Sequence, residues 1–189
     1  EIAQCLVGSE MCIRDSYKPG DYKTEVAYMG CRTRVVGDVT SPDNEVVTGR
    51  GNLSFTTINL PRLGIKYGIA LKERDKADMK GFYKELGEIM DMVRDQLLER
   101  FEVQCSKHSY NFPFLLGQGV WTNGEKLKPT DRLRKVWKHG TLSTGFIGLA
   151  ECLKALTGKH HGESDESQKL GLEIIKFMRE RCDCLLYTS

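Results

Sequence analysis

Hydrophobic residues recur every three or four positions between residues 73 and 104. This spacing places them on one face of an α-helix, so the pattern predicts a long amphipathic helix over residues 73–104. Gly81 and Gly87 weaken it only slightly, because one glycine costs about 1 kcal/mol inside a helix. The hydrophobic positions of this helix are Met79, Phe82, Leu86, Met90, Val93, Leu97 and Phe101.

Two further helices are predicted in the last third of the chain. The second is expected to begin near Thr144, because Ser143 or Thr144 can cap it, and to end at Gly158. The third is expected over residues 165–182, with Ser164 as its N-cap. Their hydrophobic positions are Phe146, Ile147, Leu149, Ala150, Leu153 and Leu156 in the second helix, and Leu170, Ile174, Ile175 and Met178 in the third.

Strands are predicted where apolar and polar residues alternate or where β-favouring residues gather. Residues 53–60 alternate and stop at Pro61, which predicts a buried strand whose polar members face a polar partner. Residues 25–36 predict a strand or extended finger, and residues 37–51 a loop rich in turn-forming residues. Residues 110–121 predict a buried irregular strand or turn. Because strands and helices take turns along the chain, the expected fold class is α/β.

Both ends of the chain are expected to be artificial. Residues 6–16 (LVGSEMCIRDS) are the translation of a transposon-based sequencing-library adaptor, and residues 1–5 fit the index region before it. Residues 184–189 (CLLYTS) are what the codons TGT CTC TTA TAC ACA TCT would encode, and these codons are the reverse complement of the same adaptor's end. We therefore expect residues 1–16 to be a disordered artefact and residues 184–189 to be a second one. The alternative is a pair of natural flexible termini.

Composition and charge exclude several classes of protein. The 28 Lys and Arg against 26 Asp and Glu give a net charge of +2 without a concentrated basic block, so no nucleic-acid partner is expected. No apolar run approaches the roughly 20 residues that span a bilayer, so no membrane partner is expected either. Four cysteines lie outside the two ends and are widely spaced, as in a reduced cytoplasmic protein rather than a disulfide framework. They are Cys31, Cys105, Cys152 and Cys182.

Four long segments of unusual composition carry the most specific signal. They are MGCRTRV at residues 29–35, GRGNLSFTTINLPRLGI at 49–65, NFPFLLGQGVW at 111–121 and KHGTLSTGFIGLAECLKALTGKHHGES at 138–164. Together they resemble the anaerobic, class III ribonucleoside-triphosphate reductases, which are glycyl-radical enzymes. The segments are far longer than a short motif, so the resemblance is correspondingly specific.

This resemblance implies a partial ten-stranded α/β barrel of the glycyl-radical enzyme and ribonucleotide reductase type. Residues 17–183 would be a fragment of that catalytic domain, in which a finger loop carries a radical cysteine. The implied activity is reduction of ribonucleoside triphosphates to deoxyribonucleoside triphosphates, as DNA precursors, by a cytoplasmic homodimer.

The resemblance also implies cofactors and partners that belong to the longer protein. A glycyl radical outside this fragment would be generated by an activating enzyme that uses an iron–sulfur cluster and S-adenosylmethionine. A structural zinc and a regulatory domain for ATP and deoxynucleotide effectors would also lie outside the fragment. The reductant would be formate or a thioredoxin-type thiol system, and the presence of Asn52 makes formate the more natural of the two.

Cys31 and Asn52 match the catalytic positions of the family. A thiyl radical at Cys31 would take the hydrogen from the ribose 3′ carbon, the 2′ oxygen would leave as water, and the thiol would return the hydrogen. Taken alone, an isolated cysteine is more often a small buried hydrophobic residue. Asn52 matches a position that offers an amide to the ribose hydroxyls. Its alternative role is that of a turn residue at the start of a strand.

A further candidate is a phosphate site in residues 138–145. The expected strand-to-helix junction would present free backbone N–H groups near Thr141, Ser143 and Gly145 to a substrate phosphate. The alternative is that Thr141 and Ser143 only cap the helix. No role is assigned to His139.

No metal site is predicted within the chain. His160 and His161 lie near Glu163, but adjacent histidines point in different directions, which favours a surface or interlocking loop. Cys105 and His108 have the spacing of one pair of metal ligands, but no second pair of ligands lies nearby in the sequence.

The fragment alone is expected to reduce no nucleotide, because most of the family's catalytic parts lie outside it, and its open strand edges make independent folding doubtful. Two other classes remain open. One is a different glycyl-radical enzyme that cleaves C–C or C–N bonds, and the other is a non-catalytic nucleotide- or metal-binding module.

Overall fold

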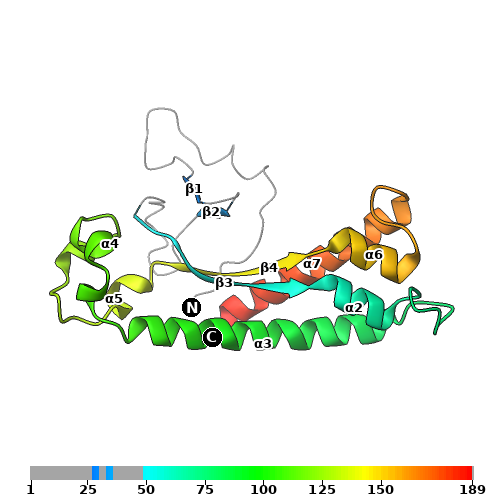
Figure 1. The fold of residues 1–189 in the computed structure, drawn as a ribbon, viewed down its shortest axis with the longest axis horizontal. Helices are drawn as coiled ribbons and strands as arrows, with labels where there is room; N and C mark the ends of the chain where they lie inside the picture. Colours follow the sequence, from blue (N-terminus) through cyan, green and yellow to red (C-terminus); the bar gives the residue numbers. More distant parts are fainter. Residues whose placement is uncertain (1–26, 30–32, 36–48, 189) are drawn as a thin grey trace. The chain divides into compact units, whose positions relative to one another are not determined.

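The computed structural model describes residues 27–29, 33–35 and 49–188, which form a mixed α/β fold (Figure 1). The chain divides into two compact units. Among the described residues, the first unit holds 27–29, 33–35, 49–54 and 97–143, and the second holds 55–96 and 144–188. Two strands and the longest helix contribute residues to both units.

Strands β1 (Ala27–Met29) and β2 (Thr33–Val35) form an antiparallel pair. Ala27 pairs with Val35, Tyr28 with Arg34, and Met29 with Thr33. The strand or finger predicted over residues 25–36 therefore contains two short strands in its described part. Cys31 lies between them in the sequence and outside the described residues.

Strands β3 (Asn52–Asn59) and β4 (Thr141–Ile147) form a two-stranded sheet. They run parallel, because close approaches ascend along both strands: Gly140 meets Leu53, Gly145 meets Thr57, and Gly148 meets Pro61. Within β3 only Ile58 is buried, so the prediction of a buried strand was wrong. In a sheet of two strands each strand keeps an open edge, and much of β3 stays accessible.

The polar members of β3 do have polar partners, as predicted, and these lie on helix α3 (Met79–Cys105). In the first unit, Arg100 Nη1 donates to Ser54 Oγ at 3.3 Å. In the second unit, Thr56 Oγ1 donates to Gln96 Oε1 at 3.0 Å.

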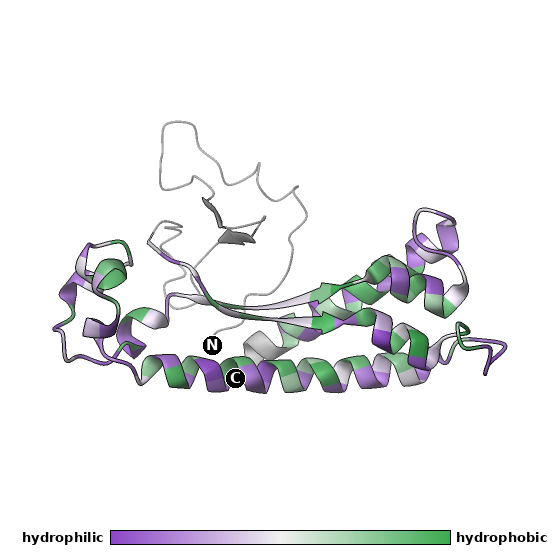
Figure 2. Cartoon of the chain, in the orientation of Figure 1, coloured by the Kyte–Doolittle hydropathy of each residue, from purple (hydrophilic) through white to green (hydrophobic). Residues whose placement is uncertain are grey.

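Helix α3 confirms the prediction of a long amphipathic helix, although it begins at Met79 rather than at residue 73. The Asp78 carboxylate accepts a hydrogen bond from the Gly81 N–H at 2.9 Å and so caps the first turn. Hydrophobic and hydrophilic residues alternate along the helix (Figure 2). Its buried positions are Phe82, Leu86, Met90, Val93, Leu97, Phe101 and Cys105.

Helix α2 (Leu60–Tyr67) was not predicted from the sequence. Pro61 sits in its first turn, where proline is favoured, and Asn59 Oδ1 accepts from the Arg62 N–H at 3.2 Å. Pro61 therefore opens a helix as well as closing a strand. Gly64 and Gly68 let α2 approach helix α6 (Leu149–Thr157) closely, because a Cβ at either position would clash with α6 backbone atoms.

The helix predicted to begin near Thr144 begins five residues later, at Leu149, because the strand β4 continues through Ile147. Gly148, with φ of +75°, is the residue before the first helical turn. A Cβ at Gly148 would lie 2.3 Å from Pro61 Cγ, so the close approach to α2 also requires glycine. The helix ends at Gly158, as predicted.

Helix α7 (Asp165–Thr188) confirms the predicted third helix and its cap, since Ser164 Oγ accepts from the Ser167 N–H at 3.2 Å. It extends beyond residue 182 and includes most of the segment that was expected to be an artefact. Arg181 ties it to α3 through two hydrogen bonds to Asp91, at 2.6 and 2.8 Å.

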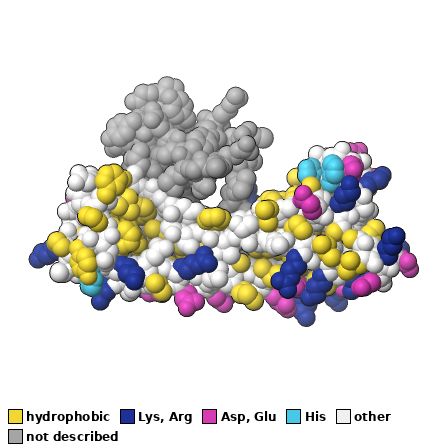
Figure 3. All heavy atoms as spheres, in the orientation of Figure 1, with side chains coloured by type: hydrophobic (Ala, Val, Ile, Leu, Met, Phe, Trp, Pro, Cys, Tyr) yellow, Lys and Arg dark blue, Asp and Glu magenta, His cyan; other side chains and the backbone are white. Residues whose placement is uncertain are grey.

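Residues 110–121 were predicted to form a buried irregular strand or turn, and they form short helical turns in which only Leu116 and Trp121 are buried. They include part of the 3₁₀ helix η3 (Ser109–Asn111) and helix α4 (Pro113–Gly117), which proline again opens. The large side chains exposed here are Tyr110, Phe114 and Val120. Figure 3 shows hydrophobic side chains gathered over the α4 end of the first unit. Two further short helices complete that unit, η4 (Gly124–Lys126) and α5 (Arg134–Trp137).

None of the helices in the described part of the chain is both long enough and apolar enough to cross a membrane.

Candidate functional site

Asn52 and Thr141 lie opposite each other where the two strands of the parallel sheet begin. The Thr141 N–H donates to the Gly51 carbonyl at 2.9 Å. We call this first backbone hydrogen bond between β3 and β4 the first rung of the sheet. Residues opposite each other on neighbouring strands project to the same side of a sheet, and the strands are about 4.8 Å apart. The two side chains therefore project from the same side of the sheet. Asn52 is exposed and Thr141 is buried.

Hydrogen bonds to alternate carbonyl groups hold the backbone around Asn52. The Gly49 carbonyl accepts from the Thr122 N–H at 2.6 Å, and the Leu53 carbonyl accepts from Gln104 Nε2 at 3.1 Å. Together with the Gly51 carbonyl, these two carbonyl groups anchor the backbone of residues 49–53 at three positions. These hydrogen bonds hold the backbone on both sides of Asn52, which favours a defined position for its side chain.

Arg50 provides a further tie between the two strand entrances. Its Nε donates to the His139 carbonyl at 2.8 Å, and both residues are buried. Arg50 is two residues before Asn52, and His139 is two residues before Thr141, so the tie lies next to the first rung. It also brings a permanent positive charge close to Asn52, because arginine stays protonated in proteins.

Two glycines allow the close packing around this rung. Gly49 has φ of +69°, and a Cβ there would lie 2.7 Å from Thr122 Oγ1. At Gly140 a Cβ would lie 2.5 Å from Leu53 Cγ. A side chain at Gly140 would push β4 away from β3, and one at Gly49 would push the start of β3 away from Thr122.

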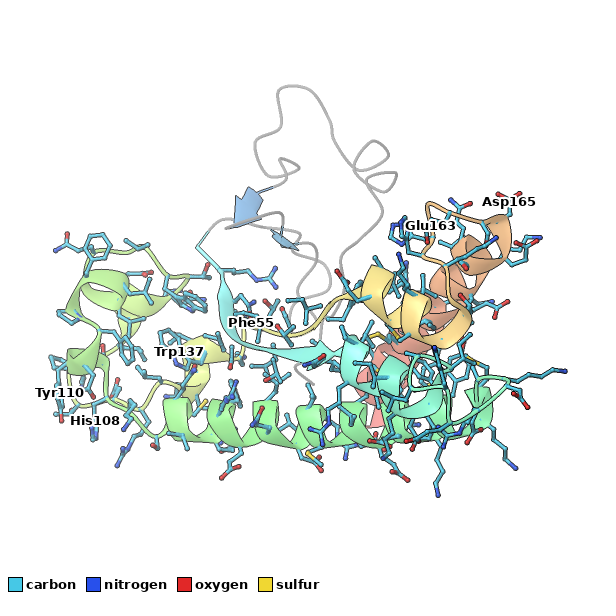
Figure 4. The ribbon with its side chains drawn as sticks, turned by 45° about the vertical axis from the view of Figure 1, so that its right-hand side comes forward. Phe55, His108, Tyr110, Trp137, Glu163 and Asp165 are labelled. Atoms are coloured by element: carbon cyan, nitrogen blue, oxygen red, sulfur yellow. The ribbon has the colours of Figure 1, made fainter. Side chains whose placement is uncertain are left out.

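Two buried polar atoms beside the rung have no hydrogen-bond partner within the described structure, namely Thr141 Oγ1 and Trp137 Nε1. Thr141 is 8 % exposed and Trp137 is 2 % exposed. Trp121, the neighbouring indole, does donate from its Nε1, to the Val136 carbonyl at 2.9 Å. Trp137 packs against the rings of Phe112 and Trp121. Figure 4 shows it away from the outer edge, where His108 and Tyr110 lie.

The structure brings some predicted site residues together and separates others. Asn52 and Thr141 are adjacent, and Ser143 follows two residues later on β4, half-buried. Gly145 also lies on β4, in the second unit. Cys31 is outside the described residues. The roles of all five stay predictions.

The expected strand-to-helix junction at residues 138–145 was wrong, because Thr141, Ser143 and Gly145 lie within β4. Their backbone N–H groups therefore do not form a helix N-terminus, which was the physical basis for the phosphate site. The sequence analysis also gave no role to Arg50, although it lies two residues before Asn52 in the segment of residues 49–65.

The described cysteines other than Cys184 are buried, and none forms a disulfide among the described residues. Burial raises the pKa of Cys105 to about 11 and that of Cys152 to about 12. Both thiols stay protonated at neutral pH, so neither serves as a thiolate nucleophile.

His160 and His161 lie in the connection between α6 and α7, where Figure 4 shows Glu163 and Asp165. Glu163 Oε2 accepts from the His160 N–H at 2.8 Å, and His160 Nδ1 accepts from the Gly162 N–H at 3.0 Å. These bonds close the loop on itself. Nowhere in residues 27–29, 33–35 or 49–188 do three or more His, Cys, Asp or Glu side chains gather to hold a metal ion.

The described site is therefore a neutral hydrogen-bonding pair with a fixed cation nearby. Asn52 and Thr141 can each donate and accept hydrogen bonds without changing protonation state. Such groups suit a polyhydroxylated, anionic ligand such as a nucleotide, whose bond-making and bond-breaking would need a further reactive group.

Comparison with known proteins identifies the family of the chain. Residues 9–186 match the family model described as anaerobic ribonucleoside-triphosphate reductase. This range includes part of the amino-terminal segment expected to be an artefact. The chain belongs to the anaerobic ribonucleoside-triphosphate reductase family.

Curated relatives with that name come from bacteria and a bacteriophage. The chain is 30% identical to the protein of Haemophilus influenzae over 157 residues, which are 82% of this chain and 20% of that protein. It is 28% identical to the protein of Salmonella typhimurium over 167 residues, 87% of this chain and 22% of that protein. It is 31% identical to the protein of Enterobacteria phage T4 over 139 residues, which are 72% of this chain and 22% of that protein. The chain thus spans about a fifth of the length of these relatives.

Proposed function

We propose that this chain is the part of an anaerobic ribonucleoside-triphosphate reductase that carries the hydrogen-abstracting cysteine and an amide for the substrate ribose. The observation that supports this most strongly is the family match over residues 9–186, which includes both MGCRTRV and GRGN. The complete enzyme would convert ribonucleoside triphosphates to deoxyribonucleoside triphosphates.

Cys31 is the proposed reactive group. As a thiyl radical, its sulfur would take one hydrogen atom from the ribose 3′ carbon and leave an unpaired electron there. Departure of the protonated 2′ oxygen as water would follow, then reduction of the sugar by two electrons. Finally the Cys31 thiol would return the hydrogen atom to the 3′ carbon. Cysteine suits this task because a thiol gives and takes a hydrogen atom reversibly.

Asn52 is the proposed ribose-binding group. Its carboxamide would donate and accept hydrogen bonds with the sugar hydroxyls while staying neutral, so it would hold the ribose without exchanging protons. The fixed backbone at Gly49, Gly51 and Leu53 supports this assignment, because a precisely held amide positions the reacting carbon better than a mobile one. Thr141, Ser143 and Gly145 remain proposed substrate-binding residues, now as members of strand β4.

The proposed architecture of the complete protein is a ten-stranded α/β barrel, of which β3 and β4 would be two adjacent strands. We also propose a cytoplasmic homodimer that responds to ATP and deoxynucleotide effectors. The family relationship supports these proposals, and the parallel pairing of β3 and β4 is compatible with a barrel of this kind.

The proposed cofactor is a glycyl radical, which would supply the unpaired electron and which an activating enzyme with an iron–sulfur cluster and S-adenosylmethionine would install. Its glycine and the cysteines for a structural zinc are expected outside this fragment. The residues in the described part do not fit a zinc site, because no three ligands gather there. Formate or a thiol system would supply the two electrons.

The test uses the complete open reading frame, purified anaerobically and treated with its activating enzyme and S-adenosylmethionine. With formate or a thiol reductant, the wild-type protein should form deoxyribonucleotides. Cys31→Ser should lower turnover below detection while the radical content measured by electron paramagnetic resonance stays normal.

Cys105→Ala is the matched control, because Cys105 is a buried thiol with no proposed role, and it should retain turnover. A protein that forms no deoxyribonucleotide but cleaves a C–C or C–N bond would be a different glycyl-radical enzyme. Full turnover by Cys31→Ser would refute the assignment of Cys31.

A further inference from the structure

The Thr141 hydroxyl is buried without a hydrogen-bond partner at a position beside the proposed ribose-binding amide. Thr141 is 8 % exposed, and its Oγ1 meets no donor or acceptor in the described structure. Buried polar groups in native proteins are almost always paired, so an isolated buried hydroxyl calls for an explanation. A group that lacks a partner in the free protein but gains one from a ligand is such an explanation.

The Thr141 hydroxyl does not stabilise the described fold through a hydrogen bond. The Thr141 backbone already makes the first rung of the sheet through its N–H to the Gly51 carbonyl, at 2.9 Å. The next residue, Leu142, is buried and apolar. Valine has the same shape as threonine and a stronger preference for strands, so packing alone would be served at least as well by valine.

The position of Thr141 indicates what the ligand would be. It lies opposite Asn52 on the first rung, and residues in this relation share one side of the sheet. A ribose offers two neighbouring hydroxyl groups, and each needs a partner when the sugar is bound away from water. Two adjacent neutral groups that both donate and accept match this demand.

We propose that the Thr141 hydroxyl binds one of the two ribose hydroxyls of the substrate while the Asn52 carboxamide binds the other. This inference rests on the proposed function and names a further contact for it. It replaces the phosphate contact expected from the sequence, because Thr141 belongs to a strand and not to a helix N-terminus.

Two neighbouring candidates fit this role less well. Ser143 is half-buried, so water can satisfy its hydroxyl in the free protein. Trp137 Nε1 is also buried and without a partner, but an indole N–H only donates, and its ring is enclosed by Phe112 and Trp121. Thr141 alone combines burial, a missing partner and a place opposite Asn52.

The first measurement separates a ligand contact from a structural role. Thr141→Val removes an unpaired hydroxyl and keeps the shape, so the melting temperature of the complete reductase should stay the same or rise. A hydroxyl that held the fold together would instead give a lower melting temperature with this variant. That result would overturn the proposal.

The second measurement tests the contact itself with substrate analogues, at saturating effector nucleotide. For the wild type, Thr141→Val and Thr141→Ser, one measures the KM of a ribonucleoside triphosphate and the competitive inhibition constants of its 2′-deoxy and 3′-deoxy analogues. Thr141→Val should weaken the ribonucleotide by roughly three- to tenfold, the worth of one net hydrogen bond. It should leave unchanged the analogue that lacks the hydroxyl bound by Thr141.

Thr141→Ser keeps a hydroxyl and should keep the discrimination between ribonucleotide and analogue. Thr57→Val is the matched control, because Thr57 is an exposed threonine of the neighbouring strand β3 without a proposed role, and it should also keep it. Thr141→Ala is a second deletion of the hydroxyl and should show the same pattern as Thr141→Val. Equal weakening of all three nucleotides, or none, would overturn the proposal.

Failure of the proposed function and failure of the Thr141 contact would give different results. A wild-type reductase that forms no deoxyribonucleotide would refute the proposed function and this inference with it. Normal wild-type turnover without any hydroxyl-specific effect of Thr141→Val would refute this inference alone.

Discussion

The Nε of Arg50 donates to the carbonyl oxygen of His139 at 2.8 Å, although the two residues are 89 positions apart. Both lie two residues before the first rung of the parallel sheet, at which Asn52 and Thr141 face each other. The Arg50 side chain therefore acts as a clamp on the entrance of both strands. Asn52 and Thr141, the proposed ribose contacts, each follow two residues after one end of this clamp. The clamp would therefore set the distance between Asn52 and Thr141.

Replacing Arg50 by methionine should destabilise the chain by about 1.5–3 kcal/mol, the usual worth of a buried hydrogen bond that involves a charged group. Arg179→Met is the control. Arg179 is exposed on α7 and its Nε lies 3.8 Å from Asp183 Oδ2, so its loss should cost less than about 1 kcal/mol. Urea unfolding followed by circular dichroism measures both. Equal effects of the two substitutions would contradict the clamp.

Gly64→Ala should destabilise the second unit by about 1–3 kcal/mol, because overpacking forces backbone shifts. The added Cβ would lie 2.8 Å from the Cys152 carbonyl oxygen of α6. Gly117→Ala is the matched control, since a Cβ there meets nothing within 4 Å. Thermal unfolding of both variants checks the prediction. If Gly64→Ala were as stable as Gly117→Ala, α2 and α6 would not be packed as described.

Glu85 links α3 to α2 by accepting hydrogen bonds from Lys66 and Tyr67. The Lys66 bond first, and then the Tyr67 bond, lower the pKa of Glu85 below its ordinary value of 4.5. A carboxyl group whose pKa is lowered by folding adds stability above the ordinary value and loses it as pH falls through the folded-state pKa. The wild type should therefore lose stability below about pH 4.5, by no more than about 1 kcal/mol because the pair is near the surface.

Glu85→Gln should be less stable than the wild type at pH 7 and should lose less stability on acidification. Glu88→Gln is the control, since Glu88 Oε1 lies 3.9 Å from Lys84 Nζ and both side chains are exposed. Melting temperatures between pH 3 and pH 7 provide the comparison. Parallel pH curves for the wild type and Glu85→Gln would show that this carboxylate does not stabilise the fold.

The buried thiols should resist alkylation in the folded chain. Burial keeps Cys105 and Cys152 protonated, with pKa values of about 11 and about 12, and Cys182 is also buried. The exposed Cys184 should react with iodoacetamide under native conditions, and the other three only after denaturation. Mass spectrometry of the digested protein assigns each site. Rapid native labelling of Cys152 would contradict the packing of α2 on α6.

The sequence predicted the parts of the fold that depend on local periodicity. Helix α3 follows from apolar residues every three or four positions, and Ser164 caps α7 because its side chain is of the type that accepts from a backbone N–H. Helix α2 was missed because Pro61 was interpreted only as the end of a strand. Proline is equally at home in the first turn of a helix, and Asn59 supplied the cap.

Strand β4 was missed for a related reason. Ser143 and Thr144 are residue types that often cap helices, yet here they continue a strand until Gly148 allows the turn into α6. The decision depends on the long-range pairing with β3, which no local pattern shows. The same holds for the site: Asn52 was found through its segment, whereas its proximity to Thr141 and the clamp by Arg50 require the folded sheet.

The most direct test of the central claim follows a hydrogen atom. The complete, activated reductase is given a ribonucleoside triphosphate that carries deuterium at the 3′ carbon. If Cys31 borrows this atom and hands it back, kcat/KM should fall relative to the unlabelled substrate. The deoxyribonucleotide should retain the label at the 3′ carbon, and Cys31→Ser should yield no product. Turnover by Cys31→Ser with the same isotope effect and the same retention of label would contradict the account.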